Sequence, residues 1–117
     1  MPGHRRIRIN ETRDVSVVHF VDRKILDEAN IQELGEELFA LVEKEDRKKL
    51  LLNFANVEYL SSAALGKLIA LEKKVRAHAG QIKLSDIRPE IYEVFQLTRL
   101  TRLFDIKDRE SEALTAF

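Results

Sequence analysis

The chain has no cysteine among its 117 residues, and it has no tryptophan. Without cysteine it can form no disulfide, no thiolate zinc site and no cysteine nucleophile. Long apolar runs are missing too, because none approaches the roughly 20 residues that a membrane-spanning helix needs. The basic start MPGHRRIRIN has no apolar core behind it, so it does not resemble a secretory signal. We therefore expect no membrane association and a cytoplasmic location.

Net charge is also absent, since 20 Lys and Arg residues balance 20 Asp and Glu residues. A general phosphate-backbone binder needs a basic excess on one face, so direct nucleic-acid binding is not expected. A short basic segment stands at the start, with His4, Arg5, Arg6 and Arg8. We interpret residues 1–5 as a flexible basic arm that leads into a solvated first strand.

The usual catalytic and ligand-binding constellations are missing. The three histidines, His4, His19 and His78, lie far apart along the chain. No two carboxylates or histidines have the spacing of metal ligands on one element, and there is no GxGxxG, P-loop or GxSxG motif. A serine nucleophile would need a base that nothing in the sequence nominates. The sequence therefore predicts no enzyme, no metal and no cofactor.

Hydrophobic periodicity predicts strands that alternate with helices. Apolar residues alternate or cluster over short β-branched runs, which indicates strands at residues 6–10, 15–21, 48–54, 81–87 and 102–106. Helical spacing predicts four helices, within 22–46, at 62–79, from 89 to about 95, and at 109–117. The order β-β-α-β-α-β-α-β-α predicts one α/β domain over residues 1–117, with a mixed, mainly parallel sheet.

Three residues carry local predictions for the helices. Asp27 has the side chain of an N-cap, and its charge suits the positive end of a helix dipole. Gly35 inside a helix costs roughly 1 kcal/mol relative to alanine, so it indicates close packing. Gly80 follows the second long helical pattern as a stop signal.

The stretch YLSSAALG, residues 59–66, places two serines where a strand turns into a helix. A serine at this position can cap the helix in its neutral form. If phosphorylated, it would carry about −1.5 to −2 charges next to the positive end of the dipole, where an anion is tolerated. The small neighbours Ala63, Ala64 and Gly66 would keep the backbone accessible. Both the capping and the switching interpretation remain open on these residues alone.

The same stretch resembles the motif of the bacterial STAS-domain anti-sigma factor antagonists. Their motif runs aromatic, aliphatic, Asp, Ser, Ser or Thr, Gly, Leu, Gly at the start of the second helix. The resemblance extends over about residues 6–117, through LLLNFANVEYL and IRPEIYEVFQLTRLTRLFDI. Aligned without gaps, five residues match the motif by type: Tyr59, Leu60, Ser62, Leu65 and Gly66.

Ser62 takes the place of the serine that is phosphorylated in the family. The chain departs from the motif at Ser61, which stands for the aspartate, at Ala63, which replaces the second hydroxyl residue, and at Ala64, which replaces the first glycine. Arg99 stands further on where the family usually has a glycine. The resemblance implies Ser62 as the phosphoacceptor, with Ser61 as a cap or second choice.

The family mechanism implies partner switching. The unphosphorylated antagonist would bind an anti-sigma factor that is also a serine kinase and so free a sigma factor for transcription. That kinase would phosphorylate the antagonist with ATP and release it, and a phosphatase would reset the cycle. A weak homodimer is a further expectation. The residues implied in partner binding are Asp22, Arg23, Tyr59, Ser61, Ser62, Ala63 and Lys67.

Two other functions remain alternatives. The missing aspartate favours a STAS scaffold that docks on a partner in a stress-signalling or transport complex without being phosphorylated. The helix start at Ser61 and Ser62 would also suit a sensor of a small ligand or nucleotide, since it attracts anions. Nucleotide-induced shifts in melting temperature would separate the sensor from the other two.

Overall fold

The computed structural model describes residues 4–117, and the predicted alternation of strands and helices is confirmed. Seven strands, four α-helices and one 3-10 helix follow one another in this part of the chain. Their bounds are β1 (Ile7–Thr12), β2 (Val15–Phe20), β3 (Lys24–Ile25), α1 (Glu28–Glu43), β4 (Lys49–Asn53), β5 (Tyr59–Leu60), α2 (Ser62–Ala77), β6 (Gln81–Ser85), α3 (Pro89–Leu97), η1 (Leu100–Arg102), β7 (Asp105–Lys107) and α4 (Glu110–Ala116).

The main sheet has five strands in the order β1-β2-β4-β6-β7. β1 pairs antiparallel with β2, and all other neighbours are parallel, as expected for a mixed, mainly parallel sheet. The predicted last strand at 102–106 is shifted, because the 3-10 helix occupies Leu100–Arg102 and β7 begins at Asp105. The prediction also missed β3 and β5, two strands of two residues each that form a separate parallel pair.

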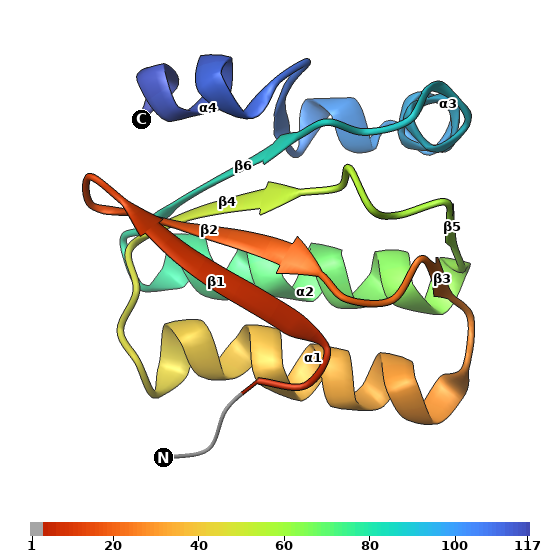
Figure 1. Ribbon diagram of the computed structural model, residues 1–117, viewed down its shortest axis with the longest axis horizontal. Coiled ribbons are helices and arrows are strands. Elements are labelled where there is room, and N and C mark those ends of the chain that lie inside the picture. Colours follow the sequence, from red (N-terminus) through yellow and green to blue (C-terminus); the bar gives the residue numbers. More distant parts are fainter. Residues whose placement is uncertain (1–3) are drawn as a thin grey trace.

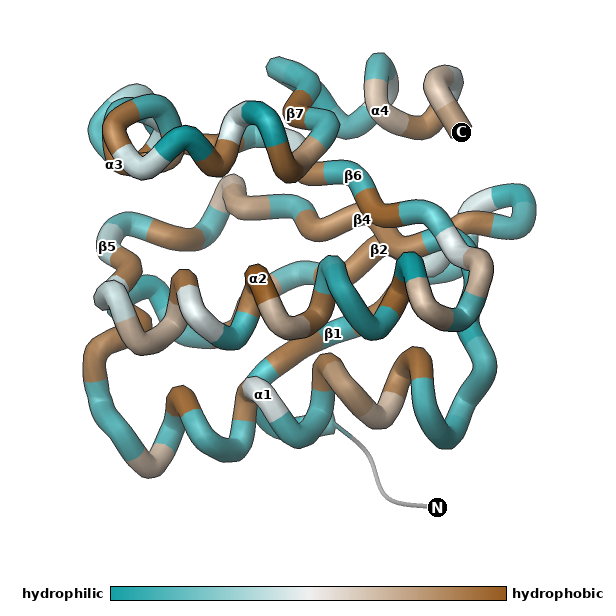
Figure 2. The backbone as a smooth tube through the Cα atoms, turned by 180° about the vertical axis from the view of Figure 1, so that it is seen from behind, coloured by the Kyte–Doolittle hydropathy of each residue, from teal (hydrophilic) through white to brown (hydrophobic). Residues whose placement is uncertain are grey.

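Helices α1 and α2 lie side by side against one face of the sheet, and α4 packs on the other face (Figures 1 and 2). The central strand β4 serves both faces. Leu50 and Leu52 join the core with α1 and α2, whereas Leu51 joins the cluster with Ala113 of α4. Because successive side chains of a strand point to opposite faces, a strand covered on both sides reads as one continuous apolar run.

The N-cap and close-packing predictions are both confirmed. The carboxylate of Asp27 accepts a hydrogen bond of 3.1 Å from the backbone N–H of Asn30. Gly35 is buried in α1, and a Cβ added there would lie 2.8 Å from Cδ of Lys67 on α2. The absent side chain therefore lets the stem of Lys67 cross α1.

The end of α2 differs in detail from the stop signal assigned to Gly80. Ala79 adopts the left-handed conformation, with φ of 60°, whereas Gly80 does not have a positive φ. The N–H of Gly80 donates to the carbonyl of Val75 at 2.9 Å, which closes the last turn. A Cβ on Gly80 would lie only 2.7 Å from the carbonyl oxygen of Lys48, so glycine is required by close approach of backbone.

Only His4 and Arg5 of the predicted basic arm fall within the described residues, since 1–3 lie outside them. The imidazole of His4 lies 3.3 Å from the carboxylate of Glu45. The backbone N–H of Arg5 donates to the carboxylate of Glu37 at 3.0 Å. Both residues thus contact α1 or the segment after it.

Arg99 is a strained position that a single substitution can relieve. It follows the end of α3 with φ of 62°, a conformation that glycine adopts without steric cost. We predict that Arg99→Gly raises the free energy of unfolding by about 0.5–1 kcal/mol, measured by urea denaturation. Arg102→Gly is the matched control, because Arg102 has no positive φ. This variant should lower the free energy of unfolding by about 0.5–1 kcal/mol. Equal losses in both variants would contradict the prediction.

Candidate functional site

Two loops meet at the carboxyl end of the central strands, one after β2 and one after β4 (Figure 1). The short strands β3 and β5 pair in parallel there, with Lys24 opposite Tyr59 and Ile25 opposite Leu60. The carbonyl of Arg23 accepts hydrogen bonds from the backbone N–H groups of Glu58, at 2.7 Å, and Tyr59, at 3.2 Å. Backbone bonds therefore fix the two loops to each other.

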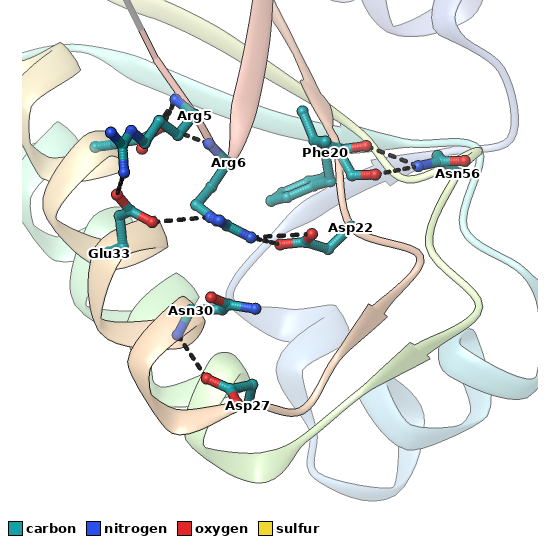
Figure 3. Close-up of polar contacts among 10 residues, drawn as sticks. Arg5, Arg6, Phe20, Asp22, Asp27, Asn30, Glu33 and Asn56 are labelled. Carbon is teal, nitrogen blue, oxygen red and sulfur yellow. Dashed lines mark hydrogen bonds and ion pairs between the residues drawn. The ribbon is translucent and has the colours of Figure 1, made fainter.

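Asn56 adds a side-chain connection between the same loops. Its Nδ2 donates to the carbonyls of Phe20, at 2.9 Å, and Val21, at 3.0 Å (Figure 3). Beneath them Phe20 packs on Phe54 with ring centroids 4.8 Å apart, and Phe54 meets Phe95 edge-on at 6.3 Å. The starts of both loops are therefore anchored in the aromatic core.

Ser61 links the loop pair to α2 and caps the helix. Its backbone N–H donates to the carbonyl of Ile25 at 3.1 Å, and its hydroxyl oxygen accepts from the N–H of Ala64 at 3.2 Å. Its extended backbone and side-chain bond are those of an N-cap residue. The capping interpretation is therefore confirmed for Ser61.

Ser62 is the first residue of α2, and its side chain is exposed. Ala63 is exposed beside it, and a Cβ added to Gly66 would meet no atom within 4 Å. Ala64 differs from the expectation, because it is 1% exposed and belongs to the core. The accessible surface at this helix start is formed by Ser62, Ala63 and Gly66.

The other predicted site residues lie around this junction in different roles. Arg23 is 71% exposed, and its guanidinium lies 3.4 Å from the carboxylate of Glu58. Asp22 faces inward instead and binds the guanidinium of Arg6 at 3.0 Å. Lys67, one turn along α2, is half-buried and donates to Oε1 of Gln32 on α1 at 3.2 Å.

Exposed apolar side chains complete the surface, and sequence reasoning missed one of them. Tyr59 is 54% exposed and Leu26 is 50% exposed. Leu26 directly follows Ile25, whose carbonyl binds Ser61, so it emerges beside the junction. Leu26 lies within the stretch 22–46 that the sequence predicts to contain the first helix, since a two-residue strand leaves no periodic signal. An exposed tyrosine such as Tyr59 is typical of protein interfaces, and Leu26 adds apolar area beside it.

The guanidinium of Arg6 is stabilised in its charged form by two carboxylates. Hydrogen bonds to the carboxylates of Asp22 and then Glu33 raise the pKa of Arg6, so its guanidinium stays charged in any usual buffer.

Within residues 4–117, no cluster of acidic residues and histidines could hold a metal ion. None of the helices within these described residues has the length and apolar character of a membrane span.

A family model for the STAS domain matches residues 6–113. The chain belongs to the STAS domain family. The match includes both loops, the Ser61–Ser62 junction, helices α1 to α3 and the first part of α4. The family expected from YLSSAALG is therefore confirmed.

Similar proteins carry the names of anti-sigma factor antagonists. The protein BtrV of Bordetella bronchiseptica, so named, is 29% identical over 93 residues, which cover 80% of this chain and 79% of BtrV. A crystal structure of a Thermotoga maritima protein with the same description is 25% identical, with a TM-score of 0.83 over 97% of this chain and 95% of that one. Phosphorylated SpoIIAA of Bacillus, 19% identical, covers 94% of this chain and 97% of its own with a TM-score of 0.70, a likeness of fold alone.

The capping geometry yields a stability prediction that separates the two serines. Ser61→Ala should lower the free energy of unfolding by about 1 kcal/mol, because the N–H of Ala64 loses its acceptor. Ser61→Asp, which restores the aspartate of the family motif, should retain the cap and the stability. Ser62→Ala is the matched control and should change stability by less than about 0.5 kcal/mol, since its side chain is exposed. Urea denaturation of the three variants measures these differences.

Proposed function

We propose that this protein is an anti-sigma factor antagonist that works by partner switching in the cytoplasm, and that it acts by binding rather than by catalysis. Its partner is an anti-sigma factor with serine kinase activity, which phosphorylates Ser62, and a phosphatase removes the phosphate. Membership of the STAS family and the names of the similar proteins support the class of function. The exposed Ser62 at the start of α2 is the observation that carries the switch.

The division of roles between the two serines supports Ser62 as the acceptor. Because Ser61 caps α2, the hydroxyl of Ser62 is not needed to hold the helix start. Its modification therefore leaves the cap intact. A phosphate on Ser62 lies near the positive end of the helix dipole, so the fold tolerates it with little local cost.

The same phosphate would act strongly on a partner. We place the docking surface on Arg23, Tyr59, Ser61, Ser62 and Ala63, with Leu26 beside them and Lys67 at its margin. A partner that packs on Tyr59 and Leu26, each about half exposed, would have to desolvate a dianion once Ser62 is phosphorylated. A tenfold loss of affinity needs only ~1.4 kcal/mol, and a buried charge without a partner exceeds that.

A constitutive docking scaffold is the second candidate, and one observation favours it. The motif aspartate is replaced by Ser61, whose hydroxyl is already engaged by the N–H of Ala64. A kinase that reads an acid beside its target serine would find none here. In that case the same surface binds a partner permanently.

Phosphopeptide mapping tests the proposed function. The protein is incubated with ATP and lysate of its own cells, beside Ser62→Ala, Ser61→Ala and the control Ser111→Ala, whose serine is exposed on α4. We expect one phosphoryl group on the wild type that is lost only in Ser62→Ala. No labelling, where a family substrate in the same lysate is labelled, would favour the scaffold. A melting shift with nucleotide alone would indicate the sensor.

A further inference from the structure

Arg6, directly before β1, connects this strand to α1 and to the loop after β2. Its Nε donates to Oε1 of Glu33 on α1 at 2.9 Å, and its Nη1 donates to both carboxylate oxygens of Asp22 at 3.0 and 3.1 Å (Figure 3). The Arg6 side chain is only 23% exposed, and both carboxylates are about a third exposed or less. A planar guanidinium with several bonds fixes direction as well as distance.

The backbone of Arg6 is fixed as well. Its carbonyl accepts from the N–H of Val21 at 3.0 Å, and its N–H donates to Oε1 of Glu37 at 2.9 Å. The guanidinium therefore starts from an anchored residue. Asp22, one residue after Val21, is held at a set distance from the sheet and from α1 by this arrangement.

The fixed loop is connected to β5 and to Ser61, at the start of α2, by three backbone hydrogen bonds. Asp22 precedes Arg23, whose carbonyl binds the N–H groups of Glu58 and Tyr59. Ile25, at the end of the same loop, binds the N–H of Ser61 at 3.1 Å. Whatever moves the loop after β2 thus moves the start of α2.

We propose that Arg6 is a positioning residue that sets the geometry of the Ser61–Ser62 junction for its partner without touching that partner. Asp22 then serves as the inner anchor of the loop, since its carboxylate is turned to Arg6, while Arg23 and Tyr59 remain the contact residues. The link from Arg6 to the junction stands on contacts within this chain. Its effect on phosphorylation rests on the proposed function.

Arg47 provides a matched control at the other end of β1. Its guanidinium binds Glu45 at 2.9 Å and Glu11 at 2.6 Å, and its side chain is also 23% exposed. Arg47 precedes β4, whereas the docking loops follow β2 and β4. Arg6→Gln and Arg47→Gln therefore remove comparable ion-pair networks, of which only one adjoins the switch.

Amide hydrogen exchange of the full chain tests the link without any partner. We expect Arg6→Gln to speed exchange at the N–H groups of Ser61, Glu58 and Tyr59 by roughly three- to tenfold relative to Arg47→Gln. Asp22→Asn should give the same pattern. Equal exchange at these amides in Arg6→Gln and Arg47→Gln would overturn the proposal.

Phosphorylation gives a second readout that a general loss of stability would not move. With the kinase activity that labels Ser62, Arg6→Gln should raise KM several-fold and leave kcat within about twofold, because binding geometry is lost and the hydroxyl remains. Arg47→Gln should leave both constants unchanged. An unchanged KM in Arg6→Gln would overturn the effect on the partner. If the wild type is not labelled at all, the proposed function fails, while hydrogen exchange still decides the link from Arg6 to the junction.

Discussion

The candidate site of this molecule depends on one short backbone ladder, the pairing of β3 with β5. Two residues on each side bring together loops that are more than 30 residues apart in the sequence, and the bond from Ser61 to the Ile25 carbonyl continues the ladder into α2. Two strands of this length are not stable alone. They persist because the side chain of Asn56 bonds to the carbonyls of Phe20 and Val21, and because the rings of Phe20 and Phe54 pack against each other where the two loops begin.

Much of the fold was predictable from the sequence because the long elements have clear periods. Leu50, Leu51 and Leu52 form an unbroken apolar run because β4 is covered on both faces, and α1 shows its buried stripe every three or four residues. Gly35 was informative for the same reason, because a costly residue in a helix marks a contact, here with Lys67. The motif around Ser62 then placed the family, since the order of elements agreed with it.

The rest could not be predicted because the determining contacts are few and distant in sequence. A two-residue strand shows no alternation, so Leu26 was assigned to a helix and its exposure was missed. Asp22 was expected in the partner-binding surface because the resemblance to the family implied it. Only the fold shows that Arg6 lies 3.0 Å away and turns that carboxylate inward. Spacing along the chain likewise could not reveal that the left-handed residue after α2 is Ala79.

The pair of serines suggests how a motif without its aspartate can still support a switch. Where the family has an acid beside the acceptor, phosphorylation adds a dianion to a site that is already negative. Here Ser61 is neutral and caps α2 through its hydroxyl, so the proposed phosphorylation of Ser62 would add about −1.5 to −2 charges beside an uncharged neighbour. The helix dipole would stabilise this phosphate, with no carboxylate at position 61 to repel it. Under the proposal, the charge difference between the two states comes from Ser62, while Ser61 caps the helix in both.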